Sequence, residues 1–99
     1  MDHEYILHYQ NFAKKNKINI LLGSLPILDK GKIYNRSVLI NHEGSIDSYY
    51  DKIHMFDVIL KNNEEYKESE IYTPGSLLKT MEIDKQLIGY SICYDLRFP

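Results

Sequence analysis

The sequence lacks several features that would indicate a specialised class of protein. A single cysteine excludes an internal disulfide framework and suits a reducing compartment, so the cytoplasm is the expected location. The formal net charge is only −2 and the charges are interspersed, which leaves no electrostatic footprint for nucleic acid or an anionic membrane. The longest apolar stretch, residues 18–28, is interrupted and far too short to span a bilayer. The first ten residues have no basic region followed by an apolar one, so no secretory signal is expected.

Metal-binding patterns are also missing. The four histidines are dispersed without ligand spacing, and one cysteine cannot build a usual zinc site, so no metal or organic cofactor is expected. What remains is an ordinary globular composition, with 43% hydrophobic and 26% charged residues. A chain of 99 residues fits one domain at most.

Hydrophobic periodicity predicts one helix followed by about five strands, an α/β arrangement. Asp2 can cap the helix, whose apolar face would hold Ile6, Tyr9, Phe12 and Ala13. Residues 18–25 read as a strand buried on both faces and stopped by Pro26. Further strands are expected at residues 34–40, 45–50, 77–83 and 86–93, with turns at residues 42–44 and 84–85.

Two segments complete this reading of the chain. Residues 57–76 are polar and aperiodic and are expected to form a long loop or an excursion of the chain. The strand at residues 86–93 is apolar enough to lie in the centre of a sheet. One helix is too little to cover such a sheet, because a sheet buried on both faces needs helices on at least one side. The imbalance predicts a truncated domain.

Cys93 follows the last apolar strand. A lone cysteine at such a place is more often an inert core residue, because free cysteine behaves as a small buried hydrophobe. Here, however, charged residues follow at once. A strand-to-turn junction suits a nucleophile, since its sulfur can project into a cleft while the next backbone N–H points at the reacting atom.

Several motifs resemble those of the nitrilase superfamily, in its amidase-like branch of Nit-type proteins. Residues 92–99, ICYDLRFP, resemble its nucleophile motif, and residues 50–57, YDKIHMFD, resemble its lysine motif. Residues 68–75, ESEIYTPG, resemble the segment that holds the family's second glutamate. The order and separations agree with the family. Two shorter matches to its strand landmarks lie upstream, GSLP at residues 23–26 and YNRS at residues 34–37.

The resemblance implies a role for each matching residue. Cys93 would attack the substrate carbon and form a thioester, while Lys52 and the backbone N–H of Tyr94 would stabilise the oxyanion. Glu68 would hold Lys52 and help to position the acyl group or the attacking water. The implied fold is part of an αββα sandwich, with residues 1–99 as a partial carbon–nitrogen hydrolase domain truncated at both ends.

The family's first glutamate, its general base, has no counterpart in this sequence. In the family it precedes the opening helix, and Glu4 is expected on that helix, so it is not assigned the role. The likeness implies hydrolysis of a small carboxamide, such as an ω-amide of a dicarboxylic acid, to the acid and ammonia. Without its base the isolated chain is expected to be inactive. Family members form homodimers, and neither the substrate nor a preference for amides over nitriles can be read from this sequence.

At several positions the sequence leaves a structural interpretation open beside the functional one. A shifted register would replace Glu68 by Glu64, Glu65 or Glu70. His54 is expected to be a structural hydrogen-bonding residue rather than the partner of Cys93. Arg97 could bind a substrate carboxylate, or form an internal ion pair with Asp95 or a neighbouring loop. For the whole chain, the alternatives are a non-catalytic remnant, a split-gene subunit completed by another chain, and a small binding module unrelated to nitrilases.

Overall fold

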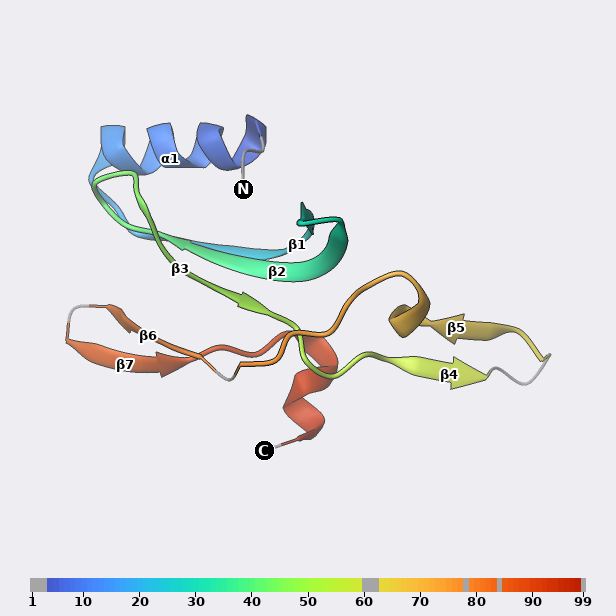
Figure 1. Cartoon of the computed structure of the whole chain (residues 1–99). Helices are drawn as coiled ribbons and strands as arrows, with labels where there is room; N and C mark the ends of the chain where they lie inside the picture. Colours follow the sequence, from blue (N-terminus) through green and yellow to red (C-terminus); the bar gives the residue numbers. More distant parts are fainter. Residues whose placement is uncertain (1–3, 60–62, 78, 84, 99) are drawn as a thin grey trace.

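The computed structural model of the chain describes residues 4–59, 63–77, 79–83 and 85–98, and it has one helix packed on a three-stranded sheet followed by two hairpins (Figure 1). Helix α1 spans Glu4–Asn16, and the sheet contains β1 (Ile20–Asp29), β2 (Lys32–Ile40) and β3 (Ile46–Asp51) in the antiparallel order β1-β2-β3. The α/β class predicted from the sequence is confirmed.

The apolar core lies between α1 and the sheet. Helical spacing places Ile6 and Ala13 on one face of α1, and both side chains are fully buried. Tyr9 and Phe12, predicted to share that face, are 39% and 48% exposed, so the buried stripe of the helix is narrower than predicted. The predicted cap, Asp2, lies outside the described residues. The core contains Ile6, Ala13, Leu22, Ile27, Val38 and Ile40.

Strand β1 differs from the prediction in two ways. It continues through Pro26 to Asp29, with an irregularity between Leu22 and Leu25. Because β1 lies at the edge of its sheet, a residue without an N–H is tolerated there. The strand is also not buried on both faces, since Leu21 and Leu28 are 49% and 62% exposed. The hairpin turn before β3 is confirmed, and Gly44 in it has a φ of +85°.

The segment predicted to be a long loop contains regular structure. Strands β4 (Asp57–Ile59) and β5 (Glu65–Lys67) form an antiparallel hairpin, and the 3₁₀ helix η1 (Glu68–Glu70) follows directly. These strands are too short and too polar to show a period of two. The prediction of a loop across residues 57–76 was therefore wrong in part.

Strands β6 (Thr80–Ile83) and β7 (Gln86–Gly89) form the second hairpin. The predicted central position of the last strand is wrong: β7 is exposed along its length and pairs with β6 in a two-stranded sheet. The strand also ends before Cys93, which begins the 3₁₀ helix η2 (Cys93–Arg97). Figure 1 shows the two hairpins extending in opposite directions from the middle of the molecule, where η2 lies.

The whole chain is elongated. Its radius of gyration is 15.3 Å, against about 13 Å for a compact domain of similar length. No helix in the described part of the chain is long and apolar enough to cross a membrane. The main apolar cluster thus lies in the α1 layer, and the two hairpins extend away from it.

Candidate active site

Lys52 and Glu68 form a buried ion pair. Lys52 directly follows β3, and its Nζ lies 2.6 Å from Oε1 of Glu68, the first residue of η1. The two residues are only 2% and 6% exposed. The same carboxylate oxygen accepts a hydrogen bond of 2.9 Å from the N–H of Phe56. A buried charge pair with an additional donor compensates its desolvation better than a bare pair.

The backbone around Lys52 is fixed from both sides. Its N–H donates to the carbonyl of Asn35 at 2.8 Å, and its carbonyl accepts from the N–H of Gly75 at 2.9 Å. A Cβ at position 75 would collide with the backbone of Asp51, so only glycine permits this close approach. The YNRS and ESEIYTPG segments therefore meet at the lysine.

Arg36 fixes the end of β3 through its contacts with Asp51. Its guanidinium contacts both carboxylate oxygens of Asp51, at 2.5 and 3.0 Å, and one oxygen of Asp29 at 3.1 Å. The guanidinium also lies 4.0 Å from the centre of the Tyr49 ring. Arg36 is 2% exposed, and its two carboxylate partners compensate the buried charge. In the sequence, Arg36 stands out only as part of the YNRS strand landmark.

Cys93 occupies a strained position at the start of η2. Its φ is +46°, in the left-handed region that residues with a side chain rarely adopt, and its side chain is exposed. Such a conformation persists only where neighbouring contacts hold it. The strand-to-turn junction predicted for the nucleophile is present, although the strand ends earlier than expected.

Asp95, two residues further on, provides those contacts. Its carboxylate accepts hydrogen bonds from the Tyr50 hydroxyl at 2.5 Å, from the His54 N–H at 2.9 Å and from the Ile92 N–H at 3.1 Å. Tyr50 and His54 lie two residues before and two residues after Lys52. The nucleophile motif and the lysine motif are therefore joined through one buried carboxylate, which is 6% exposed.

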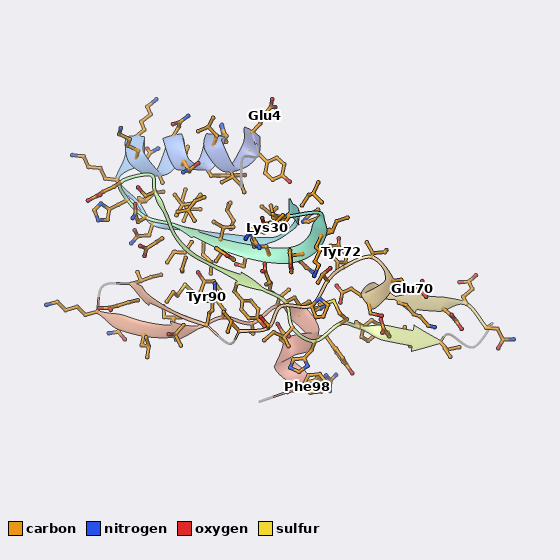
Figure 2. The ribbon with its side chains drawn as sticks, viewed as in Figure 1. Glu4, Lys30, Glu70, Tyr72, Tyr90 and Phe98 are labelled. Carbon is orange, nitrogen blue, oxygen red and sulfur yellow. The ribbon has the colours of Figure 1, made fainter. Side chains whose placement is uncertain are left out.

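An aromatic cluster packs η2 against the segment after Lys52. The His54 and Phe98 rings stack with their centroids 3.9 Å apart, and Tyr94 makes edge contacts with Phe56 at 5.2 Å and with Phe98 at 5.3 Å. The His54 ring thus packs as an aromatic surface while its backbone N–H donates to Asp95. Figure 2 shows Phe98 at the end of η2, and Tyr90 between β3 and the β6–β7 hairpin.

The structure distinguishes between several of the open interpretations. Of the four neighbouring glutamates, Glu68 is buried against Lys52, whereas Glu64, Glu65 and Glu70 are exposed. Arg97 is exposed, and within the described residues no ion pair joins it to Asp95. Asp95 was not predicted as a link to the lysine motif, because the only partner expected for its carboxylate was Arg97.

Two further observations bear on the chemistry. The described residues contain no group of three or more His, Cys, Asp or Glu side chains that could hold a metal ion. The N–H of Tyr94 lies in the first turn of η2, where N–H groups have no partner within the helix. The arrangement therefore combines an exposed thiol, a buried ammonium–carboxylate pair and a backbone N–H next to the thiol.

Comparison with known proteins gives consistent matches over the whole chain. The family model described as "Carbon-nitrogen hydrolase" matches residues 1–99. The chain is 41% identical over 100 residues to "Nitrilase homolog 2" of Dictyostelium discoideum, and the alignment covers 99% of this chain and 30% of that protein. It is 40% identical over 91 residues to "Omega-amidase NIT3" of Saccharomyces cerevisiae, and this alignment covers 90% of the chain and 31% of that protein.

Solved structures agree in fold. The Caenorhabditis elegans NitFhit protein matches 96% of this chain and 24% of its own length, with a TM-score of 0.86 and 30% identity. Saccharomyces cerevisiae Nit3 matches 99% of this chain and 33% of its own length, with a TM-score of 0.80 and 31% identity. The chain thus spans about a third or less of the proteins that it matches.

Proposed function

Because this chain belongs to the carbon–nitrogen hydrolase family, we propose that it carries the nucleophile, the lysine and a supporting glutamate of an enzyme that hydrolyses non-peptide carbon–nitrogen bonds. Family membership excludes a binding module unrelated to the nitrilases. One observation carries the proposal: the Lys52–Glu68 pair is buried directly beside the two residues to which the Cys93 turn is bonded.

In the first step the Cys93 thiolate attacks the carbon of a carboxamide. The carbonyl electrons move onto oxygen, and the ammonium of Lys52 with the N–H of Tyr94 stabilises the resulting oxyanion. A compact ammonium suits this role because it stabilises charge without requiring two-point geometry. Collapse of the adduct breaks the carbon–nitrogen bond, ammonia leaves after taking up a proton, and a thioester to Cys93 remains.

In the second step water attacks the thioester and releases the acid and the thiol. Glu68 keeps Lys52 in place during both steps and helps to position the acyl group or the attacking water. The base that takes the thiol proton and later activates water is supplied by polypeptide outside these 99 residues. A positioned base contributes on the order of 10²–10⁴-fold, so the isolated chain is expected to be inactive.

The proposed substrate is a small ω-amide of a dicarboxylic acid. This choice follows the name of the yeast relative, "Omega-amidase NIT3", which the chain resembles at 40% identity. The lone exposed thiol of Cys93 suits the reducing cytoplasm. We also propose, from the resemblance, that the complete enzyme forms a homodimer and uses no cofactor.

A chimera tests this function. Residues 1–99 replace the aligned part of yeast Omega-amidase NIT3, and ammonia release is measured with ω-amides, other short amides and nitriles. Activity that disappears in Cys93→Ala and Lys52→Met would support the proposal. The chimera's folding is checked by size-exclusion chromatography and circular dichroism.

The alternative is a non-catalytic remnant, or a subunit completed by another chain. A folded chimera that releases no ammonia would favour the remnant and contradict the proposed hydrolase. Ammonia release by the isolated 99-residue chain, dependent on Cys93, would instead contradict the proposal that the base lies outside it.

A further inference from the structure

The carboxylate of Asp95 belongs to no proposed chemical step, yet it is the most heavily bonded side chain near Cys93. It accepts three hydrogen bonds, from the Tyr50 hydroxyl, the His54 N–H and the Ile92 N–H. We propose that Asp95 is a positioning residue, which sets where the Cys93 thiol lies relative to the Lys52 ammonium. The inference rests on the proposed function, in which those two groups act together.

The bonds of Asp95 to its own turn explain how Cys93 keeps a strained backbone. The Asp95 N–H donates to the carbonyl of Ile92 at 3.0 Å, and the Asp95 carboxylate accepts from the Ile92 N–H at 3.1 Å. These reciprocal bonds close a loop around Cys93 and Tyr94. Without the carboxylate bond, the left-handed φ of Cys93 keeps only the backbone half of this support, and the residue is expected to relax towards an ordinary conformation.

The bonds of Asp95 to the lysine motif set which side of β3 the turn occupies. Lys52 directly follows β3 and still donates its N–H to Asn35 in β2, so the alternation of side chains along the strand is expected to place Tyr50 and Lys52 on the same face of the sheet. The Tyr50 hydroxyl and the His54 N–H bracket Lys52 along the chain, and both donate to the same carboxylate. The turn that begins with Cys93 is thereby held on the face that carries Lys52.

The phenol of Tyr50 is suited to this contact at neutral pH. Burial, and then the hydrogen bond to Asp95, raise the pKa of Tyr50 well above its usual value, so the hydroxyl keeps its proton and remains a donor. An asparagine at position 95 has the same shape but only one acceptor oxygen, and its NH₂ group would face donors. The Asp95→Asn substitution therefore removes bonds without removing volume.

The test uses the intact 99-residue chain, in which Cys93 is the sole cysteine. The rate of Cys93 alkylation by iodoacetamide is measured across neutral and alkaline pH, in buffer and in concentrated guanidinium chloride. We expect the folded chain to react faster than the denatured chain and with a different pH profile. Asp95→Asn should remove that difference, with a rate loss of about tenfold at neutral pH, since a misplacement of about 1 Å can cost up to roughly 100-fold.

Tyr50→Phe provides a second, milder variant, since it removes one hydroxyl and leaves the two backbone bonds of Asp95. Tyr50→Phe should reduce the rate of Cys93 alkylation less than Asp95→Asn does. The variant that combines both substitutions should react no more slowly than Asp95→Asn alone, because both substitutions break the same contact. Tyr90→Phe is the matched control. The Tyr90 ring stacks on the Tyr50 ring with centroids 5.7 Å apart, and the Tyr90 hydroxyl bonds Ser48 rather than Asp95. The pH profile of Cys93 alkylation should therefore stay unchanged in Tyr90→Phe.

Each outcome decides the inference. Circular dichroism monitors the folded fraction, and a merely structural role would lower that fraction without changing the pH profile of the molecules that remain folded. The inference is overturned if Asp95→Asn keeps the wild-type profile, or if the wild-type chain reacts identically in buffer and in denaturant. Alkylation reports the position of Cys93 whether or not an amide is hydrolysed, so an inactive chimera would contradict the function and leave this inference standing.

Discussion

The two ends of the molecule are stabilised by different kinds of contact. Between α1 and the β1–β3 sheet, the buried side chains are almost all apolar, and six of them form one core. Beyond β3, the buried side chains include Lys52, Glu68 and Asp95, while Leu77 and Leu87 are 64% and 75% exposed. Apolar burial is non-directional and tolerates small shifts, whereas buried polar groups are stable only when every bond is made.

The difference indicates that the stability of the sheet and the geometry of the site depend on different contacts in this chain. The α1 layer provides a stable support for β3, and the site segments are attached to β3 by a few directional bonds. A change in the core should lower the stability of the framework, and a change in the polar contacts should release the site segments first. Four substitutions test this contrast.

The largest effect is expected for Lys52→Met. It leaves the Glu68 carboxylate buried without its cation, and breaking a buried pair in this way costs about 3–5 kcal/mol. Urea unfolding should show the loss, and hydrogen exchange should increase first in residues 65–98 and less in residues 4–40. Lys67→Met is the control, because Lys67 pairs with Glu65 at the surface. Equal destabilisation by the two variants would contradict the buried pair.

Ile27→Ala should act on the other region. Ile27 is fully buried in the core between α1 and the sheet, and truncating such a side chain costs about 3 kcal/mol. Exchange should then increase in residues 4–40 as the framework opens. Leu28→Ala, in the same strand but 62% exposed, should have little effect. A similar loss in both variants would mean that the core described here does not stabilise the sheet.

Tyr50→Phe should cost about 2 kcal/mol at neutral pH, because it removes a donor to a buried carboxylate. The raised pKa of Tyr50, caused by burial and then by the bond to Asp95, means that the folded chain holds this proton more tightly than the unfolded chain. The contribution of Tyr50 is therefore complete below the unfolded value of about 10 and declines as the pH rises beyond it. Urea unfolding of the wild-type chain and of Tyr50→Phe should show that their difference in free energy of unfolding is smaller at alkaline than at neutral pH. A difference that stays the same at alkaline pH would contradict this contribution of the Tyr50 hydroxyl. Tyr9→Phe on α1 serves as the control.

The smallest effect is expected for Asp57→Asn at the surface. Hydrogen bonds from the Ser69 hydroxyl and then the Ser69 N–H lower the pKa of Asp57 below its usual value. Its contribution is thus present above the unfolded value and is lost as the pH falls through the folded one. Thermal unfolding should show a slight difference between the two chains at neutral pH that disappears in acid. A difference that grew in acid would reverse the sign of this linkage.

The elements predicted best from the sequence are those with a clear hydrophobic pattern. The helix was found because burial on one face imposes a period of 3.6, and the three strands of the α1 layer were found as short segments bounded by turn residues. The β4–β5 hairpin was missed because its strands have three residues each and carry no such period. The exposed position of β7 was missed because a short apolar run does not reveal whether other strands cover it.

The site shows the same division. The motifs around Lys52 and Cys93 were visible as sequence patterns, and Glu68 was favoured over its neighbours from the resemblance of residues 68–75 to the family segment. The role of Asp95 was not visible, since its three donors come from positions 50, 54 and 92 and only folding brings them together. A carboxylate two residues after the cysteine, next to the apolar run of residues 87–93, is a signal that could have suggested it, because a buried carboxylate needs nearby donors.

By itself, the sequence determined the family resemblance, the helix and the strands of the α1 layer, because local spacing encodes motifs and one-sided burial. Only the tertiary structure decided that Glu68 is the glutamate at the lysine, and that Asp95 joins the cysteine motif to the lysine motif. The physical reason is that a buried charge is stable only beside its partners, and those partners lie far apart along the chain until it folds.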